Sequence, residues 1–127
     1  MTQICKRKIM IANQRGVYTI PYQEIDYVRQ NGRKMIIAMS DGGYVETYDK
    51  VPAHFEKEYE DIDGEVFYKV KEYTVVNLSK IISLEDNTIF FEDNELHVGR
   101  DAFANLKKVF IKWWNARKYY EKTKGEN

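Results

Sequence analysis

The chain has little of what several classes of protein require. It contains a single cysteine, Cys5, so no internal disulfide framework can form, and this fits a reducing compartment. No apolar run approaches the roughly 20 residues that span a bilayer. No apolar signal core follows the basic residues at the amino end. We therefore expect a cytoplasmic protein without membrane contact.

Catalytic and metal-binding patterns are also missing. The two histidines, His54 and His97, lie far apart and show no acid–histidine–nucleophile spacing. One cysteine does not suggest the further ligands that a metal site needs. Neither a Gly-x-Ser-x-Gly motif nor a phosphate-binding glycine loop occurs. We expect no enzyme activity, no cofactor and no metal.

Net charge is absent too, but the charges are unevenly distributed. The chain has 20 Lys and Arg against 20 Asp and Glu. Between Glu46 and Glu65, eight acidic residues stand against two lysines, so the remainder carries an excess of six positive charges. A polyanion responds to the local field, and a basic face opposite an acidic one is compatible with DNA. An ordinary solvated surface is the alternative.

What the chain does have is aromatic and β-branched residues in short runs. Ten tyrosines and six phenylalanines in 127 residues favour β-structure in one domain. Asn31-Gly32 predicts a type I′ hairpin turn, and Asp41-Gly42-Gly43 predicts a second tight turn. We expect strands over the following ranges: 6–12, 17–20, 24–30, 33–39, 44–48, 67–84, 88–91 and 95–98.

Two segments have a helical period. Val51, Phe55 and Tyr59 recur every four residues, which predicts a short helix over about 50–60. From Asp101 to Lys122, apolar residues step by three and four along a longer helix. The predicted fold class is therefore α+β, mostly antiparallel β. We expect one domain over 1–127, with a core over about 6–109 and an amphipathic helical extension over 110–122.

The most informative segment runs from Phe67 to Ile81. Lys69, Lys71 and Glu72 interrupt the residues that a strand needs for packing. Burying such charges unpaired would cost several kcal/mol, so we expect them to face solvent or a polar partner. The segment therefore predicts a hairpin with a charged middle, followed by an apolar strand that ends on Asn77.

This segment and its neighbours resemble the LytTR family of bacterial DNA-binding domains, over about 6–109. The landmarks occur in the order and spacing of the family. They are Ile20-Pro21, Ile25 to Val28, Asp41-Gly42, the predicted helix before Phe67, Val70 to Asn77 with Ile81, and Leu96 to Arg100.

The resemblance implies an elongated β-domain of short sheets that binds double-stranded DNA through loops at one edge, in successive major grooves. The three matching loops are Asn31 to Lys34, Lys69 to Tyr73, and Gly99 to Asp101. Within them, the residues expected at DNA are Arg33, Lys34, Lys69, Lys71, Glu72, Tyr73 and Arg100. The second loop departs from the pattern, because Lys71-Glu72-Tyr73 replaces the usual His-Arg-Ser or His-Asn-Ser.

Three of these residues also have a structural interpretation. Arg33 and Lys34 would serve as a solubilising hairpin tip, and Arg100 would pair with Asp101 or another acid. Asn77 matches the family asparagine, and we interpret it as a buried amide that caps backbone groups at a strand end.

The resemblance implies a stand-alone transcriptional regulator. About five residues precede the first strand, so we expect no phosphorylation input in cis. The rival hypothesis is an interaction module that heterodimerises with a DNA-binding relative and blocks it; zero net charge and Glu72 favour this. The aromatic C-terminal helix also predicts a homodimer contact, against packing in cis. Its residues are Phe110, Trp113, Trp114, Tyr119 and Tyr120.

Overall fold

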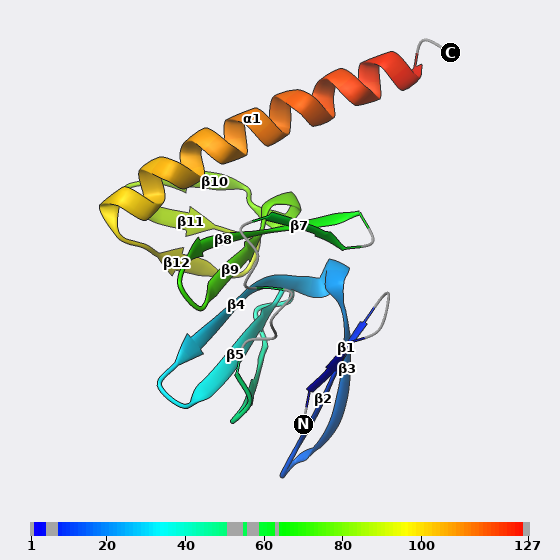
Figure 1. The fold of residues 1–127 in the computed structure, drawn as a ribbon, viewed down its shortest axis with the longest axis vertical. Helices are drawn as coiled ribbons and strands as arrows, with labels where there is room; N and C mark the ends of the chain where they lie inside the picture. The colour runs from blue at the N-terminus through cyan, green and yellow to red at the C-terminus, as the bar shows by residue number, and fades with distance from the viewer. Residues whose placement is uncertain (1, 5–7, 51–54, 56–58, 63, 126–127) are drawn as a thin grey trace.

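The computed structural model describes residues 2–4, 8–50, 55, 59–62 and 64–125 (Figure 1). Within them, the chain forms three antiparallel sheets and a long C-terminal helix, α1 (Arg100–Gly125). A small sheet has the order β1-β2-β3, from β1 (Thr2–Ile4), β2 (Lys8–Asn13) and β3 (Gly16–Pro21). Another has the order β10-β11-β12, from β10 (Ser83–Glu85), β11 (Thr88–Phe90) and β12 (Glu95–His97).

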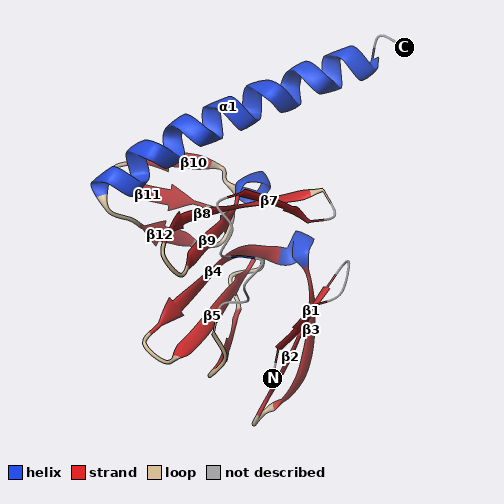
Figure 2. Cartoon of the chain, in the orientation of Figure 1, coloured by secondary structure: helices blue, strands red, loops and turns tan. Residues whose placement is uncertain are grey.

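The central sheet has six strands in the order β6-β5-β4-β9-β8-β7. Its strands are β4 (Ile25–Asn31), β5 (Lys34–Met39), β6 (Tyr44–Thr47), β7 (Tyr59–Ile62), β8 (Glu65–Lys71) and β9 (Thr74–Asn77). Two 3₁₀ turns, η1 (Tyr22–Glu24) and η3 (Leu78–Lys80), lead into β4 and out of β9. Figure 2 shows strands making up the body of the molecule, with α1 along one side. The predicted α+β class and the C-terminal helix are confirmed.

The central sheet is packed on both faces. One hydrophobic cluster joins it to the β1-β2-β3 sheet and contains Ile9, Ile11 and Ile20 together with Val28, Met35, Ile37, Phe67 and Val75. A second joins it to the β10-β11-β12 sheet and α1, and contains Val66, Tyr68, Val70 and Val76 together with Ile89, Leu96 and Leu106. Three stacked layers therefore share two cores.

Burial on both faces explains the unbroken apolar pattern of β9. Successive side chains of a strand point to opposite faces. Accordingly Val75 belongs to one cluster and Val76 to the other, and both are fully buried. A strand covered on one side would instead alternate apolar and polar residues.

One face of α1 packs in cis, and other residues on the same turns are exposed. Leu106 is fully buried, and Phe103, Phe110 and Trp113 pack partly against the second cluster. Ile111 and Trp114 are 55% and 49% exposed. Figure 1 shows the helix continuing well beyond the sheets. No helix of the described residues has the length and apolar character to cross a membrane.

Three local predictions need correction. Tyr59 and Glu60 belong to strand β7, paired with Tyr68 and Phe67, so the helix predicted over 50–60 is wrong at that end. Most of that segment, including His54, lies outside the described residues. The strand predicted over 67–84 is divided into β8, β9, η3 and β10.

The third correction concerns the β4–β5 turn. Asn31 pairs with Lys34, so the two central residues are Gly32 and Arg33. Among the four residues 31–34, only Gly32 has positive φ, at 64°. A type I′ turn needs positive φ at both central positions, so that assignment is wrong although the hairpin is present.

Candidate DNA interface

The first loop expected at DNA is the tip of the β4–β5 hairpin. Arg33 and Lys34 are exposed there. Arg33 makes no ion pair with any described residue. The ammonium Nζ of Lys34 lies 3.4 Å from a carboxylate oxygen of Glu46 and 5.6 Å from the ring centre of Tyr48. The charge of Lys34 is therefore partly compensated within the protein, and that of Arg33 is not.

The second loop is the two-residue turn between β8 and β9. Lys71, Glu72 and Tyr73 are exposed, as the sequence predicted for Lys71 and Glu72, and Lys69 is half-buried. The register shifts between Lys69 and Lys71, which leaves Val70 as a bulge. A bulge bends its strand and re-aims the side chains beside it, here at the base of the turn.

Tyr73 has an unusual backbone conformation. Its φ is 60°, in the left-handed region that normally favours glycine. For a residue with a Cβ this costs about 1 kcal/mol. The ring of Tyr73 is nevertheless 48% exposed, so burial of the side chain does not offset that cost. Strain of this kind gathers at functional sites.

The third loop joins β12 to α1. Arg100 is exposed at the first residue of the helix, and the amide of Phe103 donates to the carbonyl of Gly99 at 2.9 Å. Arg100 makes no ion pair within the described part of the chain, so the predicted alternative of a pair with Asp101 does not occur there. Its guanidinium is free to meet a ligand.

The first two loops lie side by side. β4 pairs with β9 in antiparallel register, with Arg29 opposite Thr74, so both turns emerge at the same end of the sheet. The amide of Gln30 donates to the carbonyl of Tyr73 at 2.9 Å. This bond between main-chain groups fixes the spacing of the two hairpin tips.

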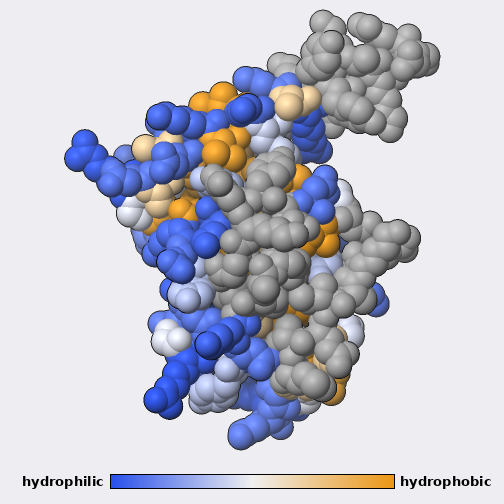
Figure 3. Space-filling view, viewed as in Figure 1, coloured by the Kyte–Doolittle hydropathy of each residue, from blue (hydrophilic) through white to orange (hydrophobic). Residues whose placement is uncertain are grey.

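The third loop lies on the same margin. Figure 1 shows the start of α1, the β8–β9 turn and the β4–β5 turn in succession down the left side of the view. Figure 3 shows mostly hydrophilic side chains along that margin. Helix α1 also contacts β8, the strand that leads into the second turn. Loops from distant parts of the sequence therefore form one edge.

A polar network joins the segment before β12, in the β10-β11-β12 sheet, to the central sheet. The side-chain amide of Asn94 donates to a carboxylate oxygen of Asp26 at 2.8 Å and to the carbonyl of Met39 at 2.7 Å. The hydroxyl of Ser40 donates to the other oxygen of Asp26 at 3.0 Å. Burial raises the pKa of Asp26 above its ordinary value, and the hydrogen bonds from Asn94 and Ser40 oppose that rise. Because Asn94 immediately precedes β12, the network ties the start of that strand to the central sheet.

Asn77 has the structural role that the sequence predicted. It is fully buried and its side-chain amide donates to the carbonyl of Ile25 and to Glu65, both at 3.1 Å. Its side-chain oxygen accepts from the amide of Ser79 at 3.1 Å and from the hydroxyl of the same residue at 2.7 Å. Asn77 therefore caps η3 and anchors the β8–β9 hairpin.

Arg29 was not singled out from the sequence. It lies on β4, opposite Ile36 on one side and Thr74 on the other. Its Nε is buried and has no hydrogen-bond partner within the described residues. Its position two residues after Tyr27 could have indicated partial burial, because alternate residues of a strand share a face. Tyr27 packs against the second cluster.

An antiparallel β-scaffold that exposes Arg33, Lys71 and Arg100 along one edge, none of them ion-paired within the described residues, is suited to binding a polyanion. The family model of the LytTr DNA-binding domain matches residues 15–111, about three quarters of the chain. The protein therefore belongs to the LytTR family and is a DNA-binding domain of transcriptional regulation. The match includes all three loops and ends within α1. Comparison with curated proteins and with solved structures gives no match.

Proposed function

We propose that this protein is a sequence-specific regulator that binds double-stranded DNA in the cytoplasm through the edge formed by the three loops. The observation that carries the proposal is the bond between Gln30 and Tyr73, which holds two charged hairpin tips together. Loops at a fixed spacing can enter successive major grooves on one side of a duplex. Membership of the LytTR family supports DNA as the ligand.

The side chains divide into two roles. Arg100 and Arg33 are the proposed base readers, since a guanidinium fork can bond the O6 and N7 atoms of guanine together. Glu72 joins them as an acceptor from the N4 amine of cytosine, a contact that offsets its repulsion from phosphate. Lys34, Lys69 and Lys71 are the proposed phosphate anchors.

Selection from a randomised duplex pool by gel shift, at low and moderate salt, tests the proposal. We expect a consensus to emerge. On that consensus, Arg100→Ala should weaken binding by about 1–3 kcal/mol, because one bidentate base contact is lost. On random DNA the same variant should change affinity much less. An equal loss on both DNAs would show that Arg100 is not a base reader.

Glu72 favours a second candidate function, an interaction module that heterodimerises with a DNA-binding relative and antagonises it. A carboxylate exposed at the tip of the second loop repels phosphate and is complementary to a basic protein surface. The same gel shift separates the candidates, since a module of this kind retains no DNA even at low salt. Restoration of DNA binding by Glu72→Gln would assign the defect to that one charge.

A homodimer through α1 is the proposed assembly. Ile111 and Trp114 leave apolar area exposed on α1. We expect a dimer in sedimentation, and a monomer when both residues are replaced by glutamate. Lys112→Glu, an exposed change on the same turn, is the matched control for added negative charge. A dimer that survives the double change places the contact elsewhere.

A further inference from the structure

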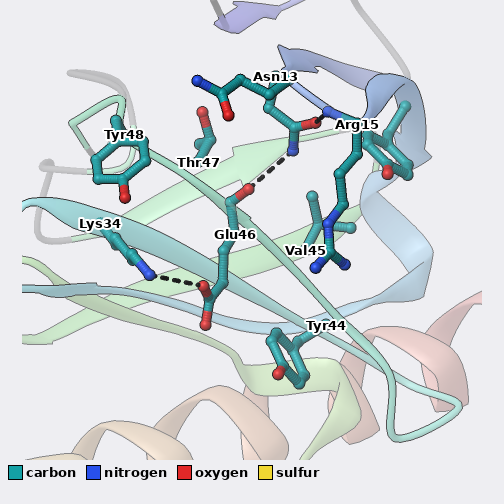
Figure 4. Close-up of a pocket in the computed structure, with 10 residues that line it drawn as sticks. Asn13, Arg15, Lys34, Tyr44, Val45, Glu46, Thr47 and Tyr48 are labelled. Carbon is teal, nitrogen blue, oxygen red and sulfur yellow. Dashed lines mark hydrogen bonds and ion pairs between the residues drawn. The ribbon is translucent and has the colours of Figure 1, made fainter.

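A cleft of about 350 Å³ lies between the β2–β3 turn and the β5–β6 hairpin (Figure 4). Two cations line it, Arg15 and Lys34, together with the carboxylate of Glu46. Three tyrosines also line it, Tyr18, Tyr44 and Tyr48. Its volume lies at the lower end of the range for pockets that hold small organic molecules.

The walls of the cleft are held in place independently of Arg15. The side-chain amide of Asn13 donates to the carbonyl of Glu46 at 2.9 Å, which ties the β2–β3 turn to β6. The side-chain oxygen of Asn13 accepts from the amides of Arg15 and Gly16, at 2.9 and 3.2 Å, and shapes the turn. The cleft is therefore held by hydrogen bonds between the Asn13 side chain and backbone groups, which a change of the Arg15 side chain leaves intact.

The charges in the cleft favour a single negative charge on the ligand. Lys34 is already paired with Glu46 at 3.4 Å. The guanidinium of Arg15 makes no ion pair or hydrogen bond with the described residues. Figure 4 shows this side chain extending from the β2–β3 turn towards Tyr44 and Glu46. Two cations and one carboxylate leave one uncompensated positive charge, which one carboxylate would neutralise.

The tyrosines favour a planar aromatic ligand. Tyr44 and Tyr48 are 66% and 73% exposed at the mouth of the cleft; the ammonium of Lys34 lies 5.6 Å from the ring centre of Tyr48, and the ring of Tyr44 offers the more open apolar surface. Aromatic rings stack on such faces with a gain beyond area burial alone. The cleft thus combines a free guanidinium with stacking surfaces.

We propose that this cleft binds a small planar aromatic carboxylate and that its occupancy opposes DNA binding. The ligand carboxylate pairs with Arg15 and adds a negative charge near Lys34, which also lines the cleft, so the ligand competes with DNA phosphate for that ammonium. The coupling to DNA rests on the proposed function, because it assumes that Lys34 contacts phosphate. Binding of the ligand itself does not rest on it. By linkage, DNA must weaken ligand binding by the same factor.

The first experiment measures ligand binding without DNA. The full chain is titrated with 2-naphthoate, and backbone amide shifts are followed by NMR. We expect saturable shifts in residues 13–18 and 44–48, and an affinity reduced about tenfold or more by Arg15→Ala, since a charge-assisted contact is lost. Tyr44→Ser, which changes an exposed side chain, should weaken binding severalfold. Equal binding of uncharged 2-naphthol, or shifts confined to α1, would overturn the site.

The second experiment measures coupling. With 2-naphthoate at saturation, the dissociation constant for DNA should rise, and it should rise much less for Arg15→Ala. Without the probe, Arg15→Ala should bind DNA as the parent protein does; a loss there would make Arg15 a DNA contact instead of a ligand contact. Bound probe with unchanged DNA affinity would overturn the coupling. If the protein binds no DNA, the NMR titration still decides whether the cleft is a site.

Discussion

The two hairpins that meet at the candidate DNA interface place different residues at the turn position with positive φ. Both are two-residue turns at one end of the central sheet, and both have one residue with positive φ. In the β4–β5 turn that residue is Gly32, which adopts the conformation without steric cost. In the β8–β9 turn it is Tyr73, which does not. Retaining a large exposed ring where glycine would be relaxed indicates that the ring itself is used.

The lysines on the two tips also differ. Lys34 on the first tip is paired with Glu46, whereas Lys71 on the second has no ion pair among the described residues. The first tip is therefore relaxed, with one of its two cations compensated, and the second is strained, with Glu72 next to a lysine that has no ion pair among the described residues. We infer that the β8–β9 turn is the more specialised of the two.

The largest expected effect comes from removing the anchor of the second hairpin. Asn77→Ala should lower the free energy of unfolding by about 2–4 kcal/mol, because buried groups of Ile25, Glu65 and Ser79 lose their partners. Urea denaturation measures it. Asn31→Ala, at the exposed end of β4, is the matched amide deletion and should cost much less. Similar losses for both would deny Asn77 its anchoring role.

Exchanging the turn chemistry should separate stability from binding. Tyr73→Gly should raise the free energy of unfolding by about 0.5–1 kcal/mol through relief of strain, while DNA affinity falls. Gly32→Ala should lower it by about 1 kcal/mol, since an added Cβ meets open space and only the backbone resists it. Thermal unfolding and gel shift on the same samples measure both quantities. A Tyr73→Gly protein that is less stable would mean that the ring contributes packing.

The charge difference should appear in the salt dependence of DNA binding. Lys71→Ala should reduce the slope of log affinity against log salt by about 0.9, the value for one phosphate contact. Lys34→Ala should reduce it by about half as much, because Glu46 already compensates part of that charge. In a Glu46→Gln background the two lysines should become equivalent. Filter binding over a range of salt concentrations measures the slopes.

The smallest expected effect concerns the network behind the first hairpin. Burial raises the pKa of Asp26, so the folded protein binds a proton that the unfolded chain releases above pH about 3.8. The free energy of unfolding should therefore fall as the pH rises from that value through the folded-state pKa. Asp26→Asn should flatten this dependence, and Glu85→Gln, at an exposed carboxyl, should not.

Much of the first hairpin was predictable, and its exact turn was not. Asn31-Gly32 indicated the hairpin, but placing those two residues at the centre would set Arg29 opposite Lys34. Like charges directly opposite each other destabilise a strand pair. The observed register sets Arg29 opposite Ile36 and Asn31 opposite Lys34, and so avoids that clash. A two-residue turn signal does not contain this cross-strand information.

The parts that local patterns missed depend on distant partners. The four-residue spacing from Val51 predicted that a helix extends to Tyr59, yet Tyr59 belongs to strand β7 and pairs with Tyr68. The positive φ of Tyr73 follows from its turn and from the bond to Gln30. The sequence has no glycine at this position that would have indicated it. In contrast, the charged middle of 67–81, the burial of Asn77 and the helix from residue 100 were visible in the sequence, because each depends on neighbouring residues.

The hydrogen bond from Gln30 to Tyr73 has an evolutionary consequence. Both partners are backbone groups, so the bond survives most substitutions at either position. The distance between the two tips is thus inherited with the scaffold, while the side chains on them remain open to exchange. New operator preferences can then arise by replacing one tip residue at a time, without a search for a new docking geometry.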